Sequence, residues 1–270
     1  MGEEVQILYQ FFRKWTRTTK IALVLSLVAL ALGVLTFTTM MGIIPLPITK
    51  ARISIGKIEV VDEGGYPVFR IWLTANRWPV KLELFYKNET GAQMLSLGVA
   101  LVNNSAELPA KITPIAFPFT LAWAFGQGPN LPPGLYIIMA STAEHTTTKG
   151  MRLEGAKLAI TDWGMWITYW YSPYEEYWTI DNITLHVMNV GDCPAYVRYV
   201  NILVEELNLR STYYLARTLT ILPDQHKEFT ATPFWSPMRI DRAGTYHVVF
   251  TINFGYDEFT YVAEVSFHPF

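Results

Sequence analysis

The start of the chain and the remainder follow two different patterns of apolar and polar positions. Residues 21–44 form one uncharged apolar run. A helix of that length covers about 36 Å at roughly 1.5 Å per residue, which is enough to cross a hydrocarbon core of about 30 Å. In the short tail before it, residues 1–20, apolar positions recur at helical spacing and predict an interfacial helix. We therefore expect a tail followed by a membrane-spanning helix.

Basic and aromatic residues directly before the apolar run predict its orientation. They are Arg13, Lys14, Trp15, Arg17 and Lys20. Positive charges stay on the cytoplasmic side, and Trp prefers the level of the headgroups. We therefore expect a single-pass protein of the cell membrane, with a cytoplasmic N-terminus and residues 45–270 outside the cytoplasm. Two alternatives remain open: a secretory signal cleaved near Ala29-Leu30-Ala31, and cleavage after Lys20 as in archaeal pilins.

Small residues line one face of the predicted span. Ala22, Ser26, Ala29 and Gly33 follow at i, i+4, i+7 and i+11. Small faces let helix backbones approach closely, so this face is a candidate for packing against a partner helix. Small residues are also common in membrane helices without such a partner, and the spacing alone does not decide between the two.

Beyond the apolar run, alternation between apolar and polar residues predicts strands. It runs through residues 52–60, 68–74 and 81–86, with Asp62-Glu63-Gly64-Gly65 as a turn after the first segment. The stretch Leu203–Leu209 is ambiguous, and we interpret it as a strand. Short strands with turn signals at regular intervals are typical of a β-sandwich.

A weak internal repeat divides the strand region. Residues 73–80 and 187–195 each contain a strand that leads to Asn, then a turn, then Pro and another strand. Asn189 follows Asn76 by 113 positions, and the Gly of Gly244-Thr245-Tyr246 follows that of Gly134-Leu135-Tyr136 by 110. Two anchors with nearly equal offsets indicate two copies of one module, residues 45–155 and 156–270. The connector is expected at Gly150–Lys157.

Three segments of the second module carry a family resemblance. Residues 179–192 hold a strand and an Asn-x-Gly turn, residues 222–229 a turn and strand, and residues 243–250 a Gly-x-Tyr-x-Val strand. Together they resemble CARDB-type domains, immunoglobulin-like sandwiches of prokaryotic and especially archaeal cell surfaces. The resemblance covers residues 178–267 and implies an adhesion, scaffold or interaction role. The expected fold class is all-β: two tandem immunoglobulin-like sandwiches preceded by one transmembrane α-helix.

Composition excludes several classes of function. Acidic residues outnumber basic ones, 23 to 21, so nucleic acid is not an expected partner. Cys193 is the only cysteine, which excludes a disulfide within the chain and favours a small core residue. The histidines lack ligand spacing, and no nucleophile elbow, phosphate loop or dinucleotide fingerprint occurs. We expect no catalytic residue, no metal site and no cofactor, and a protein that is not an enzyme.

An aromatic segment, residues 163–171, is the first candidate interface. Alternation along a strand places Trp163, Tyr169 and Tyr171 on one face, and Trp166 and Trp170 on the other. One row can fill a core between the modules, meet a partner or remain exposed. Aromatic rows make strong protein interfaces and also bind sugars, and we favour a protein over a glycan.

A second candidate interface lies in the uncharged stretch of residues 114–125. Trp123 and Phe125 stand there directly before a loop rich in Gly and Pro. The stretch fits a core strand and loop, or a loop that presents the two rings to a partner or to the membrane surface.

Three sequons begin at Asn88, Asn103 and Asn182, all on the predicted outer side, where glycans can be attached. The function expected from the whole sequence is that of a membrane-anchored extracytoplasmic protein of the cell envelope. Its partners are the lipid bilayer and other envelope or membrane proteins, including further copies of itself. Two alternatives are an accessory subunit of a membrane enzyme or transport complex, and a subunit of a surface filament.

Overall fold

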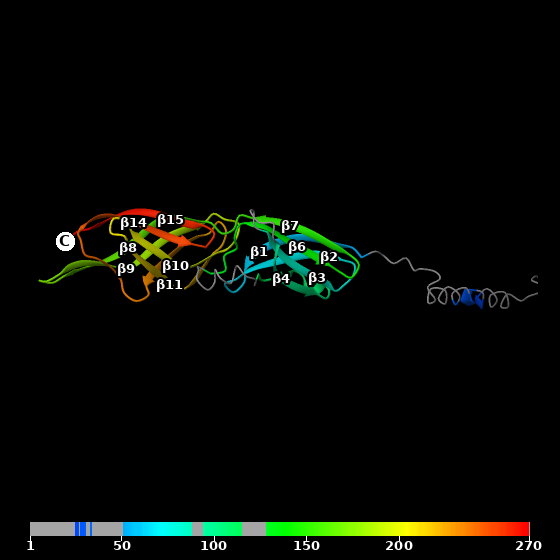
Figure 1. Cartoon of the computed structure of the whole chain (residues 1–270). Coiled ribbons are helices and arrows are strands. Elements are labelled where there is room, and N and C mark those ends of the chain that lie inside the picture. Colours follow the sequence, from blue (N-terminus) through cyan, green and yellow to red (C-terminus); the bar gives the residue numbers. More distant parts are fainter. Residues whose placement is uncertain are drawn as a thin grey trace, which may run out of the picture. The chain divides into compact units, whose positions relative to one another are not determined.

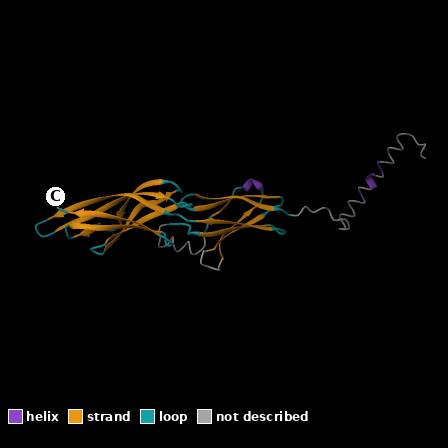
Figure 2. Cartoon of the chain, turned by 90° about the horizontal axis from the view of Figure 1, so that it is seen from above, coloured by secondary structure: helices purple, strands orange, loops and turns teal. Residues whose placement is uncertain are grey.

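The computed structural model describes residues 51–87, 94–114 and 128–269, together with residues 25, 26, 28–30 and 33. The chain forms two units, Met1–Lys50 and Ala51–Phe270. In the second unit the described elements are strands apart from one short 3-10 helix, η1 (Ser105–Glu107) (Figure 1, Figure 2). The all-β sandwich class predicted from alternation is confirmed at this level.

The described residues of the first unit are helical and exposed. They include Ser26, Ala29 and Gly33 of the predicted small-residue face. Outside the described residues lie Ala22 and the predicted membrane anchors Arg13, Lys14, Trp15, Arg17 and Lys20. Among the described residues, no helix has the length and apolar character needed to cross a membrane.

The first lobe, residues 53–153, consists of two antiparallel sheets. One has the strand order β1-β2-β5 and the other the order β4-β3-β6-β7. The strands are β1 (Ile53–Asp62), β2 (Pro67–Ala75), β3 (Val80–Lys87), β4 (Met94–Val102), β5 (Ala110–Ile112), β6 (Gly134–Ser141) and β7 (Thr146–Leu153).

The second lobe, residues 158–267, repeats this order with one addition. Strands β11-β10-β14-β15 correspond to β4-β3-β6-β7, and β8-β9-β12 to β1-β2-β5, with β13 added on β9. The strands are β8 (Leu158–Tyr171), β9 (Glu176–Asn189), β10 (Ala195–Val204), β11 (Leu209–Ile221), β12 (His226–Pro233), β13 (Met238–Ile240), β14 (Gly244–Asn253) and β15 (Glu258–Phe267). Strand β12 pairs with β9 and, at Tyr213↔Pro233 and Tyr214↔Thr232, also with β11, so it joins the two layers at one corner.

Each lobe has its own apolar core, and alternation along the strands explains it. In β3, the side chains of Val80, Leu82, Leu84 and Tyr86 are buried, and the charged residues between them point outward. Strand β14 follows the same rule in the second lobe. Burial of one face per strand fixes the register, since a slip by one residue would expose the whole apolar row.

Two contacts recur at equivalent places in the lobes. The hydroxyl of Tyr136 donates to the carbonyl oxygen of Pro132 at 2.8 Å, and that of Tyr246 to the carbonyl oxygen of Arg242 at 3.0 Å. Each tyrosine thus reaches four residues back over the glycine that starts its strand, a contact known as a tyrosine corner. The Gly-x-Tyr pattern found in the sequence therefore has the same structural role in both halves.

Two expectations about local structure are wrong. Strand β7 continues to Leu153, so the connector consists of residues 154–157 rather than Gly150–Lys157. The stretch Leu203–Leu209 is not one strand, because residues 205–208 form a turn between β10 and β11. Asn208 adopts a φ of 49° there, and its N–H donates to the carbonyl oxygen of Glu205 at 3.1 Å. Asn tolerates the left-handed region better than most residues, and this makes the turn feasible.

Candidate functional site

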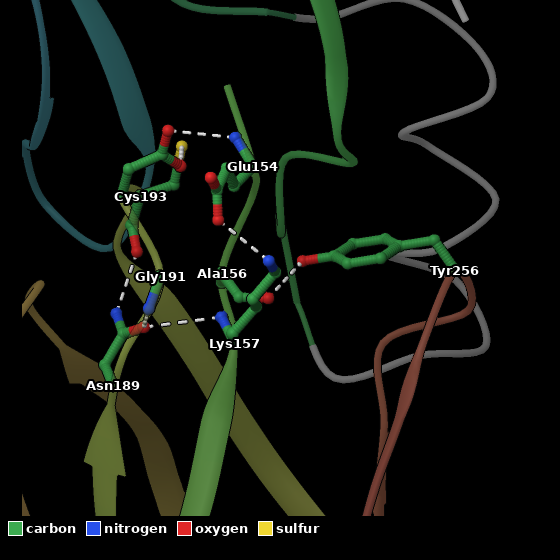
Figure 3. A network of polar contacts seen from close by, with 8 residues as sticks. Glu154, Ala156, Lys157, Asn189, Gly191, Cys193 and Tyr256 are labelled. Atoms are coloured by element: carbon green, nitrogen blue, oxygen red, sulfur yellow. Dashed lines mark hydrogen bonds and ion pairs between the residues drawn. The ribbon is translucent and has the colours of Figure 1, made fainter. Parts of the chain in front are cut away.

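The Asn189 side chain, at the end of β9, is fully buried and organises the junction between the lobes (Figure 3). Its Nδ2 donates to the carbonyl oxygens of Cys193 at 2.8 Å and Ile221 at 2.9 Å. Its Oδ1 accepts from the N–H groups of Gly191 at 3.0 Å and Lys157 at 3.4 Å. All four hydrogen-bonding positions of the amide are used. Asn189 therefore ties the β9–β10 turn to β11 and to the connector.

The connector and the β9–β10 turn run backbone against backbone. The N–H of Val190 donates to the carbonyl oxygen of Lys157 at 2.8 Å, and that of Asp192 to the carbonyl oxygen of Gly155 at 3.2 Å. A Cβ atom on Gly191 would lie 2.2 Å from the oxygen of Gly155, so only glycine fits there. The Asp192 carboxylate also accepts from the N–H of Glu154 at 2.9 Å. The short connector is thus held along its length.

A second link joins the lobes through Tyr196, a buried residue of β10. Its backbone N–H donates to Oδ1 of Asn130 at 2.8 Å, and its carbonyl oxygen accepts from Nδ2 of the same side chain at 3.0 Å. The Tyr196 hydroxyl donates to the Asp62 carboxylate at 2.9 Å, at the end of β1. Burial, and then the bond to Asp62, hold the pKa of Tyr196 above its usual range.

The third link is formed by Tyr256, which lines an open polar cavity of about 340 Å³ at the junction. The Tyr256 hydroxyl donates to the carbonyl oxygen of Ala156 at 3.0 Å (Figure 3). On the cavity wall, Lys157 Nζ lies 2.8 Å from the Glu154 carboxylate; this bond lowers the pKa of Glu154 and raises that of Lys157. The pair is exposed, so its contribution to stability is small. Two of the charged groups on the cavity wall, Glu154 and Lys157, are therefore paired with each other.

Cys193 belongs to the core of the first lobe, although it follows β9 of the second lobe. Its side chain is fully buried, as predicted for a small core residue. Burial raises the pKa of the thiol well above its usual range, and the neighbouring Asp192 carboxylate acts in the same direction. The thiol therefore remains protonated, and reaches reagents only when the junction opens.

Labelling of Cys193 by iodoacetamide at pH 8 is expected to be at least about 100-fold slower in the native protein than in concentrated guanidinium chloride. The unfolded thiol titrates near pH 8.5, whereas the raised pKa keeps the native thiol neutral at this pH. Mass analysis of the alkylated chain over time measures both rates. Equal rates would mean that the junction is open in solution.

The aromatic segment of β8 divides between core and solvent. Trp163 and Tyr169 pack against the second lobe's own core, so neither covers the first lobe. Trp166 and Trp170 are 66% and 52% exposed. Tyr171 was expected on the same face as Trp163 and Tyr169, but it ends the strand, does not pack against that core and is 74% exposed. An extra residue in β8, Thr161, shifts the register between Ile160 and Asp162, an irregularity that strict alternation does not predict.

Sequence reasoning missed a second aromatic surface, which we call the aromatic stripe and define as Tyr199, Tyr214, Phe234 and Trp235. Successive ring centroids lie 5.8, 5.6 and 4.7 Å apart. Phe234 is 65% and Trp235 90% exposed. The signal in the sequence was an aromatic pair inside a turn bounded by Pro233 and Pro237. Tyr214 joins it only because β11 pairs with the end of β12.

The remaining sequence candidates are scattered. Asn103 is exposed after β4, and Asn182 lies within β9, opposite Trp166. Asn88, Trp123 and Phe125 lie outside the described residues. Across residues 51–87, 94–114 and 128–269, no group of three or more His, Cys, Asp or Glu residues could hold a metal ion.

Comparison with known proteins assigns no family. No protein-family model matches the chain, and no curated protein matches it. Function must therefore be argued from the geometry of the lobes, their junction and their aromatic surfaces.

Proposed function

We propose that this protein is a single-pass, membrane-anchored interaction protein of the cell envelope. Residues 21–44 would anchor it, with residues 1–20 in the cytoplasm and the two lobes outside. The lobes would be immunoglobulin-like sandwiches, the second related to CARDB-type domains, and would bind other envelope proteins. In this proposal the protein is not an enzyme.

The strand orders and the tyrosine corners support the immunoglobulin-like assignment. Each lobe packs a three-strand path, β1-β2-β5 or β8-β9-β12, together with a four-strand sheet. In immunoglobulin-like domains the corner tyrosine stands near the start of the sixth strand, and Tyr136 near the start of β6 occupies that place. Tyr246 near the start of β14 is its counterpart.

The single observation that carries the interaction role is the aromatic stripe. Isolated exposed apolar residues are common, but four rings in successive contact on one surface are not. Trp, Tyr and Phe are enriched at the centres of protein interfaces, because large rigid rings bury much area at little entropic cost. At Trp235 the ring is almost entirely available to a partner.

The junction supports the same role. Its three links hold the lobes together, so a partner bound to the second lobe is held at a limited range of positions relative to the first. Ordering of the lobes before binding reduces the entropy lost on association.

Extraction of the full chain from its own membranes, followed by native mass analysis, tests this role. The wild type is expected to carry an envelope protein in fixed stoichiometry. The F234A/W235A double substitution is expected to lose at least about 90% of that complex, because hot-spot aromatics dominate interface energies. Y174A is the matched control: it removes a ring that is 96% exposed but lies outside the stripe.

A monomeric wild type, or a complex that survives F234A/W235A, would contradict an interaction through the stripe. A complex with the subunits of a membrane enzyme would favour the accessory role, and shearable polymer would favour a filament. The orientation has its own test. Protease added to intact cells should digest the lobes, and lobes cut only after permeabilisation would exclude an extracytoplasmic position.

A further inference from the structure

Strands β8 and β9 form a hairpin (Figure 1). Its outer face carries two exposed tryptophans that do not belong to the core, Trp166 and Trp170. Trp166 lies opposite Asn182, and Trp170 opposite Tyr177. Both rings point away from the second core, against which Trp163 and Tyr169 pack. These outward residues lie outside the aromatic stripe.

A chain of hydrogen bonds fixes the orientation of Trp170. Its Nε1–H donates to the hydroxyl of Thr179 at 3.2 Å. That hydroxyl donates to the carboxylate of Asp181 at 2.9 Å, and the hydroxyl of Thr168 donates to the same carboxylate. Asp181 can accept further hydrogen bonds, because a carboxylate has about four acceptor positions. The indole is therefore held beside an acceptor that still has capacity.

The ring of Tyr177, on the neighbouring strand, also holds Trp170 in place. The rings of Trp170 and Tyr177 are nearly parallel, at 19°, with centroids 6.2 Å apart. The guanidinium carbon of Arg239 lies 3.8 Å from the centroid of Tyr177, and Arg239 is fixed in turn by Glu175 at 2.9 Å. A surface ring that is held at its edge by a hydrogen bond and by one neighbouring ring loses little freedom when a ligand stacks on it.

The residues between the rings indicate the chemistry of the ligand. Gly164 pairs with Thr184. From this pair to the tip of the hairpin, the described outward positions of β8 and β9 hold aromatic, hydroxyl, amide and carboxylate side chains and no aliphatic one. Protein interface centres are depleted in acidic residues, and Ser and Thr are under-represented among binding hot spots. A sugar ring has complementary chemistry, because its C–H face stacks on an aromatic ring and its hydroxyls pair with polar groups at the edge.

We propose that this face binds a neutral oligosaccharide, with Trp166 and Trp170 as stacking platforms and Asp181 as a hydrogen-bond acceptor. Four residues along a strand separate the two rings by about 13 Å, so a single sugar cannot cover both. Acidic sugars are disfavoured because Arg239 is already paired with Glu175 and Asp241, whereas Asp181 and Glu176 have no ion-pair partner among the described residues.

The test uses the full chain, made in a host without N-glycosylation and kept in a detergent without a sugar headgroup. The first condition leaves the sequon at Asn182 unmodified, so any bound sugar comes from the probe. The probes are β-1,4-linked hexasaccharides of glucose, mannose and N-acetylglucosamine, their monosaccharides, and a hexasaccharide of galacturonic acid. Binding is measured by titration calorimetry and by tryptophan fluorescence.

At least one neutral hexasaccharide is expected to bind, its monosaccharide at least about 10-fold more weakly, and the acidic hexasaccharide not at all. W166A and W170A should each weaken binding at least about 10-fold, the scale of one lost stacking contact. W235A is the matched control, because it removes a still more exposed tryptophan from the aromatic stripe, and should bind as the wild type does.

Absence of binding by all three neutral hexasaccharides at millimolar concentration overturns the proposal, as does equal binding by W170A and W235A. Neither result touches the protein-binding role, which depends on the aromatic stripe. Far-ultraviolet circular dichroism of each variant checks that the lobes are folded.

Discussion

Replacing Gly191 with alanine is expected to destabilise the protein by about 3 kcal/mol or more, because its added Cβ makes the shortest contact found at any described glycine. The new Cβ would lie 2.2 Å from the oxygen of Gly155 and 2.6 Å from the nitrogen of Lys157. Both are backbone atoms, so no side-chain rotation relieves the clash. The β9–β10 turn must move away from the connector, and the hydrogen bonds of Val190 and Asp192 to it lengthen or break.

Urea unfolding gives the free-energy change, and alkylation of Cys193 shows whether the junction opens before the lobes unfold. The matched control is G164A, where a Cβ would meet nothing nearer than 3.8 Å. Its effect should remain within about 0.5 kcal/mol, as for most substitutions away from such contacts. If G191A and G164A proved equally stable, the backbone approach at Gly155 would not exist in solution.

Replacing Asn189 with alanine is expected to lower the free energy of unfolding by about 4 kcal/mol. The substitution leaves two carbonyl oxygens, those of Cys193 and Ile221, and two N–H groups, those of Gly191 and Lys157, without their partner. Each buried polar group left unsatisfied costs about 1–3 kcal/mol, and water that enters the gap recovers part of this.

The comparison is N76A, the equivalent position in the first lobe. Asn76 accepts from the N–H of Arg52 at 2.7 Å, as Asn189 does from that of Lys157, but Asn76 is exposed to solvent. Solvent can replace its lost bonds, so N76A should cost about 1 kcal/mol. Urea titrations of the two variants give the difference, and a smaller loss for N189A than for N76A would contradict the organising role of Asn189.

Alternation and local motifs predicted the strands well because they report on burial of one face. The edges of β1, β2 and β3 came within two residues of the alternating segments, and the Asn and Gly-x-Tyr anchors of the repeat have matching hydrogen bonds in both lobes. The strand edges and the Gly-x-Tyr contacts depend on neighbours within a few residues, which a sequence displays directly. The Asn contacts reach across 24 and 32 positions, and the sequence indicated these residues only through the repeat.

Features that depend on distant strands could not be predicted in the same way. Asn130 meets Tyr196 across 66 positions, and Tyr214 meets Phe234 only because the end of β12 pairs with β11. The extra residue at Thr161 and the turn at Asn208 change local geometry without changing the apolar pattern. Only one of the two candidate surfaces could therefore be predicted from the sequence. The spacing of the aromatic residues indicated Trp166 and Trp170, whereas the aromatic stripe is recognised only in the folded structure.

Cys193 has a consequence for how such a protein can be divided or recombined. Its sulfur fills space in the first lobe but is delivered by a turn of the second. A gene fragment that encodes only the first lobe would lack Cys193 and leave a cavity in that lobe's core. A fragment that encodes only the second lobe would expose the turn that carries Cys193. Although the two lobes share one strand order, they cannot be recombined as independent domains.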